Sequence, residues 1–174
     1  TRSCSATSCA TRGSPGAAPP ETAHATAIMS SSLSDGASAS PNAQGCCGGL
    51  AWHTGDLAAA QAAARRNLEA FPADVDAILT NAAGCGSAMH EYALILRGTP
   101  DEARAKAFCK RVVDVSVFLP QPEPRGWSEK TTVAYHDACH LANAQGVRNE
   151  PRELLRAIPG VELSEVDNAH LCCG

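Results

Sequence analysis

Two Cys-Cys-Gly triplets, at 46–48 and 172–174, are the residues of this sequence best suited to chemistry. Cys85 follows the first triplet after 36 residues, and Cys139 precedes the second by 32 residues. Thiolates are soft ligands that select zinc or iron–sulfur clusters. Neighbouring glycines let the backbone approach closely and leave N–H groups free to bond sulfur. The pattern therefore indicates two sites for metal binding or thiol redox chemistry.

The number and arrangement of the cysteines argue against a secreted, disulfide-bonded domain. The count is odd, neighbouring cysteines rarely bridge each other because the ring is strained, and no secretory signal is legible. In a reduced compartment, clustered cysteines are usually metal ligands or redox groups. Zinc sites usually carry Cys-x-x-Cys pairs, and none is present, although a structural zinc module stays an alternative. The nine cysteines are Cys4, Cys9, Cys46, Cys47, Cys85, Cys109, Cys139, Cys172 and Cys173.

Several other residues have both a functional and a plain structural interpretation. Cys109 lies in a predicted helix and is expected to pack as a small hydrophobe. Histidines near the triplets could bind metal or hydrogen-bond a cluster sulfur, but capping of a turn is the interpretation we favour. Asp137 could orient such a histidine. The histidines concerned are His53, His90, His136 and His140.

Composition and charge exclude some classes of partner. The net charge is −4 and no long basic run is present, so nucleic acid and anionic membrane are disfavoured as partners. Apolar runs such as Ala-Leu-Ile-Leu at 93–96 are far too short to span a bilayer. The expected location is cytoplasmic, with attachment to the inner membrane only through other subunits.

The chain divides into an N-terminal stretch and a part with the pattern of an α/β protein. Of the first 45 residues, 33 are Ala, Ser, Thr, Pro or Gly, so residues 1–44 are predicted to be disordered or out of frame. Beyond them, helices are predicted over 54–71, 87–97, 101–119 and 151–158, and strands over 75–80, 131–135 and 161–166.

Strand, helix and strand at this spacing predict parallel pairing with right-handed crossovers. Because each half carries a Cys-Cys-Gly, we expect two similar units: a first cysteine-rich domain over 45–120 and a second over 131–174, joined by a proline-rich linker over 121–130. Cysteines at the carboxyl ends of parallel strands would then converge.

The sequence around the cysteines resembles that of one family. Gly-Cys-Cys-Gly-Gly-Leu-Ala-Trp-His at 45–53, Asn-Ala-Ala-Gly-Cys-Gly at 81–86 and Tyr-His-Asp-Ala-Cys-His-Leu-Ala at 135–142 are similar to iron–sulfur subunits of glycolate oxidase. The resemblance covers about residues 43–174. The same cysteine-rich pattern occurs in one subunit of heterodisulfide reductase, in one of anaerobic glycerol-3-phosphate dehydrogenase and in lactate-utilisation proteins.

The resemblance implies a function and a set of ligands. A 4Fe-4S type of iron–sulfur cluster would be bound by Cys46, Cys47 and Cys85 in the first unit and by Cys139, Cys172 and Cys173 in the second. The subunit would accept electrons from a flavoprotein that carries FAD and oxidises glycolate or another 2-hydroxy acid, and would pass them toward a quinone. It would be a non-catalytic part of the oxidoreductase.

This sequence also departs from the family pattern. No closely spaced ferredoxin-type cysteines are present, and the late cysteine of the second unit is missing, so the chain is interpreted as a fragment. Neither Cys4 nor Cys9 lies in family-like sequence, and neither is counted as a ligand. A thiol–disulfide or glycerol-3-phosphate dehydrogenase subunit and an inactive truncated product remain as alternatives.

Overall fold

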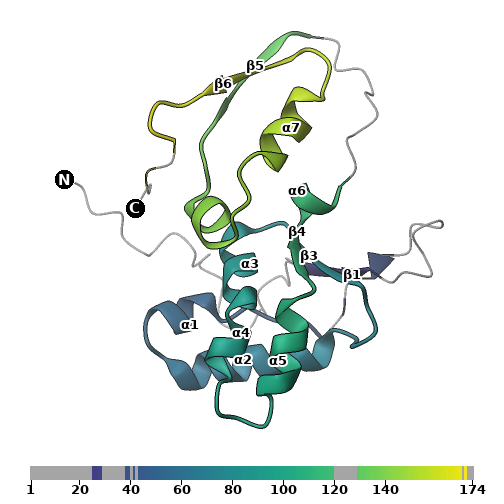
Figure 1. The fold of residues 1–174 in the computed structure, drawn as a ribbon, viewed down its shortest axis with the longest axis vertical. Helices are drawn as coiled ribbons and strands as arrows, with labels where there is room; N and C mark the ends of the chain where they lie inside the picture. The colour runs from purple at the N-terminus through teal and green to yellow at the C-terminus, as the bar shows by residue number, and fades with distance from the viewer. Residues whose placement is uncertain are drawn as a thin grey trace, which may run out of the picture.

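The computed structural model describes residues 25–28, 38–39, 41, 43–119, 129–169 and 171. Most of these belong to a helical unit around two parallel strands, and the remainder form a smaller strand–helix–strand unit that lies at one end of the first (Figure 1). Cys4, Cys9, Cys172, Cys173 and most of the predicted linker lie outside the described residues. The domain boundaries predicted from the sequence stay a prediction.

Four strands form the sheet of the first unit, in the order β2-β1-β3-β4. Strand β3 (Ala77–Thr80) pairs in parallel with β4 (Val112–Asp114), with Ile78 opposite Val112. The helices α3 (Ala83–His90), α4 (Tyr92–Ile95) and α5 (Glu102–Cys109) connect them. This pairing confirms the predicted α/β class with parallel strands and crossover helices.

Two strands lie inside the segment predicted to be disordered or out of frame. Strand β1 (Ala25–Ile28) pairs antiparallel with β3, and β2 (Ser38–Ala39) pairs antiparallel with β1. Strand β1 pairs on the edge of β3, and β2 pairs on the edge of β1. The prediction for the segment as a whole stays a prediction. Apart from these strands and the residues just before 45, the segment lies outside the described residues.

The Ala-rich helix predicted over 54–71 is α2 (Leu57–Ala70). Its N-cap is Asp56, whose carboxylate accepts a hydrogen bond from the Ala59 N–H at 3.0 Å. Alanines at helical spacing, with Leu68, face the core, and they allow the neighbouring helices to approach closely. Before it, the short helix α1 (Gly49–His53), which was not predicted, follows the first Cys-Cys-Gly directly.

The core of the first unit is aromatic and aliphatic. Tyr92 stacks on Phe108 with ring centroids 5.5 Å apart, and Phe71 meets Phe108 edge-on at 5.8 Å. Other large side chains that are almost fully buried are Leu68, Ile78, Ile95 and Leu96. The core therefore fixes α2, α4 and α5 against β3.

Two of the predicted helices were wrong in extent. The stretch 101–119 is not one helix: α5 ends at Cys109, and β4 and the short α6 (Val115–Phe118) follow. The β-branched pair at 112–113 completes the parallel ladder with β3, and this pairing prevails over the helical spacing. The stretch 87–97 is likewise divided into α3 and α4 at Glu91.

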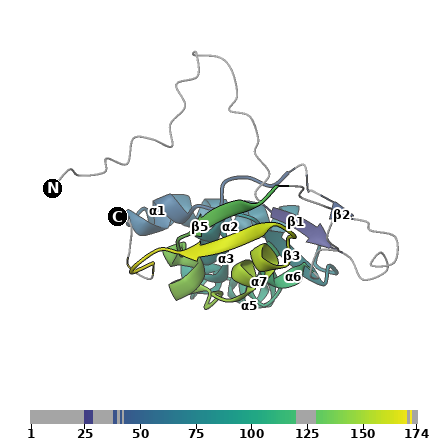
Figure 2. The same ribbon diagram turned by 90° about the horizontal axis from the view of Figure 1, so that it is seen from above.

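The second unit agrees with its predicted elements. Strand β5 (Thr131–Tyr135) pairs in parallel with β6 (Val161–Glu165), and Thr131 lies opposite Val161. Between them come a π-helical turn, η3 (His140–Ala144), and α7 (Glu150–Arg156), which packs against β6. Figure 2 shows the two paired strands running across the top of the molecule.

Among the described residues, no helix is both long enough and apolar enough to cross a bilayer.

Candidate functional site

The first cysteine group comes from two places in the first unit. Cys46 and Cys47 precede α1, and Cys85 lies in the first turn of α3, just beyond the carboxyl end of β3. The thiols of Cys85 and Cys46 hydrogen-bond the Cys47 sulfur. Cys46 is exposed, whereas the other two are partly buried. The structure thus brings together all three cysteines predicted for the first site.

Cys85 lies inside a helix, although that helix was predicted to begin only at residue 87. The turn after β3 is short, and α3 begins at Ala83, so Cys85 is helical. Together with Cys47 it lines a small pocket whose other walls are Gln44, Gly45, Asn67, Phe71 and Met89.

The glycines after the two cysteines permit the close packing of this site. Gly48 has a φ of 78°, a left-handed conformation that side chains disfavour. A Cβ there would lie 2.8 Å from the Ala63 Cβ on α2. The N–H of Gly48 points to the Cys46 sulfur and that of Gly49 to the Cys47 sulfur, each at 3.5 Å. Each sulfur therefore has a backbone donor within reach, and the one at Cys47 stabilises its thiolate.

The thiol of Cys47 is acidified by its neighbours. The hydrogen bond from Cys85, assisted by the Gly49 N–H and by Cys46, lowers the pKa of Cys47 to about 6, although burial opposes the shift. Cys47 is thus largely a thiolate at neutral pH. A thiolate is the form that binds soft metals and attacks electrophiles.

Two buried polar residues that the sequence did not single out for the site lie directly beneath it. Asn67 of α2 and Tyr92 of α4 both hydrogen-bond the backbone of the Cys-Cys-Gly segment. Burial raises the pKa of Tyr92, so its hydroxyl stays protonated. The available signal was an asparagine on the buried, alanine-lined face of a helix.

The second cysteine group is represented by Cys139, because Cys172 and Cys173 lie outside the described residues. Cys139 is the N-cap of η3, shortly after the carboxyl end of β5, and it is partly buried. Its sulfur lies 3.6 Å from Nδ1 of His140. That histidine therefore contacts a cysteine, as one of its two sequence interpretations allowed.

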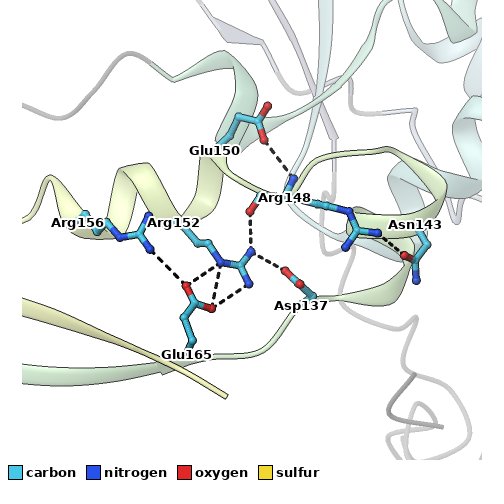
Figure 3. Close-up of polar contacts among 7 residues, drawn as sticks. All are labelled: Asp137, Asn143, Arg148, Glu150, Arg152, Arg156 and Glu165. Atoms are coloured by element: carbon cyan, nitrogen blue, oxygen red, sulfur yellow. Dashed lines mark hydrogen bonds and ion pairs between the residues drawn. The ribbon is translucent and has the colours of Figure 1, made fainter. Parts of the chain in front are cut away.

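Arg152 of α7 joins Asp137, which follows β5, to Glu165 at the end of β6, as Figure 3 shows. Its guanidinium donates to Asp137 at 2.7 Å, to both oxygens of Glu165 at 2.9–3.1 Å and to the Arg148 carbonyl at 2.6 Å. It also lies over the Tyr135 ring, 4.6 Å from the centroid. Asp137 therefore orients an arginine, and not the histidine considered from the sequence.

The hydrogen bonds of Cys109 and His90 go to residues outside the first cysteine group. The Cys109 thiol donates to the Met89 carbonyl at 3.3 Å, and burial raises its pKa. His90 bonds the Cys109 backbone, and burial lowers the pKa of its imidazole. The prediction that Cys109 packs as a small hydrophobe agrees with its contact with the core.

The donor set fits an iron–sulfur cluster better than a single ion. In the described part of the chain, no three His, Cys, Asp or Glu side chains are arranged to hold one metal ion. Cysteine thiolates hold such clusters, and N–H groups that bond the sulfurs tune the cluster's reduction potential. Cys46, Cys47 and Cys85, with the two glycine N–H donors, provide such a surface.

Comparison with known proteins gives a family match. The model of the cysteine-rich (CCG) domain matches residues 6–90 and 133–174, and so begins well before the expected residue 43. No solved structure matches the chain significantly.

Three curated relatives illustrate the similarity, and each alignment covers 77% of this chain. The probable glycolate oxidase iron–sulfur subunit of Bacillus subtilis is 39% identical over 140 residues, which are 32% of its length. Lactate utilization protein A of Geobacillus kaustophilus is 36% identical over 57% of its length. A fumarate reductase (CoM/CoB) subunit of Methanothermobacter marburgensis is 34% identical over 26% of its length. The chain thus spans between a quarter and just over half of these relatives, and the predicted resemblance is confirmed.

Proposed function

The chain belongs to the cysteine-rich (CCG) domain family, and from this we propose that it is part of an iron–sulfur, electron-transferring subunit of a complex that oxidises a 2-hydroxy acid. Glycolate is the acid we favour, because an iron–sulfur subunit of glycolate oxidase is 39% identical to the chain. The observation that carries the proposal is the contact of three cysteine thiols, one of them acidic, at the end of a parallel strand.

The proposed ligands are the two cysteine groups. Cys46, Cys47 and Cys85 would hold the cluster of the first unit, and Cys139, Cys172 and Cys173 that of the second. A 4Fe-4S cluster supplies one-electron transfer when bound. This chain's own contribution concerns Cys47: the Cys85 contact and the Gly49 N–H favour its thiolate before any metal binds.

The proposed partner is a flavoprotein that acts on the acid itself, since a similar protein is named as one subunit of a glycolate oxidase. FAD on that partner would take two electrons from the 2-hydroxy acid, and this subunit would carry them singly toward a quinone. The complex would be cytoplasmic or peripheral at the inner membrane. The names of the relatives, as a glycolate oxidase subunit and a lactate utilization protein, support this assignment.

Metal analysis of the full chain tests the proposal. The chain is produced anaerobically, reconstituted with iron and sulfide, and analysed for iron, sulfide and zinc and by EPR. We expect iron and sulfide in near-equal amounts with a cluster signal. Cys85→Ser should lower the iron content of the first site, whereas Cys109→Ser is the matched control and should leave it unchanged. Zinc without iron, or equal iron in both variants, would contradict the assignment.

A thiol–disulfide reaction is a second candidate, favoured by the low pKa of Cys47 beside the Cys85 thiol. In it, the Cys47 thiolate would attack a disulfide, releasing one thiolate, and Cys85 would then displace the second as a Cys47–Cys85 disulfide forms. Incubation of the full chain with a small disulfide separates the candidates. Release of two thiol groups per chain, with Cys47 and Cys85 oxidised, supports the second candidate. Unchanged cysteines exclude it.

A further inference from the structure

Two side chains beneath the first cysteine group are polar although the core around them is apolar. Asn67 is 2% exposed and Tyr92 is fully buried. Burying an amide or a hydroxyl is costly unless its hydrogen bonds are made. Leu68 and Phe108, their neighbours in the core, show that apolar residues would fill this region without that cost. The hydrogen bonds of Asn67 and Tyr92 should therefore explain why polar residues are buried here.

Nearly all of those bonds go to the backbone that carries Cys46 and Cys47. The Asn67 amide donates to the Cys46 carbonyl at 3.2 Å, and its oxygen accepts from the Gly45 N–H at 3.0 Å. The Tyr92 hydroxyl donates to the Cys47 carbonyl at 2.9 Å. The remaining bond joins the pair itself: the Asn67 amide donates to the Tyr92 hydroxyl at 2.8 Å.

The two residues come from different elements, and this determines what they can fix. Asn67 lies on α2 and Tyr92 begins α4, so the cysteine segment is tied to two helices whose apolar faces form the rigid core. Three consecutive residues make these hydrogen bonds: the Gly45 N–H donates, and the carbonyls of Cys46 and Cys47 accept. The segment has no regular secondary structure of its own before α1 begins at Gly49. The side chains of Asn67 and Tyr92 therefore hold the backbone conformation of this segment.

We propose that Asn67 and Tyr92 are positioning residues for the cysteine site: they fix the backbone of residues 45–47 so that the sulfurs of Cys46 and Cys47 face Cys85. Their effect on an iron–sulfur cluster rests on the proposed function. Their effect on the backbone does not, and it is measurable in protein that holds no metal.

The test uses Tyr92→Phe in the full chain, because this change removes one hydroxyl and keeps the ring that packs on Phe108. Tyr135→Phe is the matched control: it removes the hydroxyl of the other tyrosine and keeps the ring beneath Arg152. Asn67→Ala is a second variant, which removes all the bonds of the amide. Two readouts are needed, namely amide hydrogen exchange of residues 45–48 in metal-free protein and the EPR spectrum after reconstitution.

We expect Tyr92→Phe to speed exchange in residues 45–48 about fivefold, as the loss of one hydrogen bond implies, and Asn67→Ala to speed it further. Peptides of α2 and α5 should exchange as in the wild type. The EPR line shape should change in Tyr92→Phe and not in Tyr135→Phe. Unchanged exchange in residues 45–48, or faster exchange spread evenly over the core, would overturn the proposal. A wild type without iron would instead count against the proposed function, and the exchange data would still decide this inference.

Discussion

The imidazole rings of His53 and His140 stack, with centroids 5.6 Å apart and planes inclined by 12°. His53 ends α1, the helix that follows the first Cys-Cys-Gly, and His140 is adjacent to Cys139 of the second group. The stacking therefore joins the two units beside their cysteines. Figure 1 shows η3, which carries His140, lying next to α3.

A second contact at this junction involves Gln145, just after η3. Its amide donates to the Ala83 carbonyl at 2.9 Å, in the first turn of the helix that carries Cys85. Gly86 of the same helix lies beneath it: a Cβ there would lie 2.7 Å from the Thr80 hydroxyl oxygen and 2.8 Å from the Gln145 nitrogen. The absence of a side chain at Gly86 is what allows this approach.

Gly86→Ala is therefore expected to weaken the junction. The added methyl must displace Thr80 or Gln145, and overpacking of this kind costs about 1–3 kcal/mol. Gly84→Ala, in the same helix, is the control, because a Cβ at Gly84 meets nothing within 4 Å. Urea unfolding followed by circular dichroism should show a loss for the first variant and no loss, or a gain of up to about 1 kcal/mol, for the second. Equal stability of the two variants would show that the junction does not form as described.

The sequence was most informative where local signals agree with the final contacts. Asp56, followed by an Ala-rich stretch that ends before Pro72, predicts α2 correctly, because cap, propensity and terminator all act within the segment. The strands predicted over 131–135 and 161–166 are β5 and β6: the first is rich in β-branched residues, and apolar and polar residues alternate at the start of the second. The three cysteines of the first group were predicted to meet, and they do.

Features that depend on distant contacts could not be predicted in the same way. β4 has the apolar spacing of a helix, and only its ladder with β3 makes it a strand. The role of Asn67 depends on Tyr92, 25 residues later, and that of Gly86 depends on Gln145 in the other unit. Such pairings are not visible in local periodicity. Whether Cys172 and Cys173 join Cys139 stays a prediction.

Arg152→Gln should destabilise the second unit. Arg152 is the shared partner of Asp137 and Glu165, and its side chain is only 13% exposed. Removing its charge leaves the nearly buried Asp137 carboxylate without that partner, a loss of about 1–3 kcal/mol. Arg156→Gln is the matched control, since Arg156 lies one turn later, is 57% exposed and contacts the same Glu165 at 3.4 Å. It should cost no more than about 0.5 kcal/mol.

Limited proteolysis and hydrogen exchange of β5, β6 and α7 measure these two variants locally. Arg152→Gln should loosen these three elements and leave the α2 and α5 peptides of the first unit protected. If Arg156→Gln loosened them equally, the special position of Arg152 between the two strand ends would be contradicted.

The last prediction concerns the reactivity of Cys47 in metal-free protein. Because contact with Cys85 lowers its pKa to about 6, Cys47 should be alkylated by iodoacetamide with a half-maximal rate near pH 6. Burial raises the pKa of Cys109, so that thiol should stay unmodified through pH 8. A lowered thiol pKa also stabilises the fold fully above the unfolded value of about 8.5, and this contribution is lost as the pH falls through 6.

Mass spectrometry of the modified peptides measures the rates. In Cys85→Ala, the half-maximal rate at Cys47 should move to higher pH, because the thiol that donates to its sulfur is removed. An unchanged profile in this variant would show that the two cysteines are not in contact.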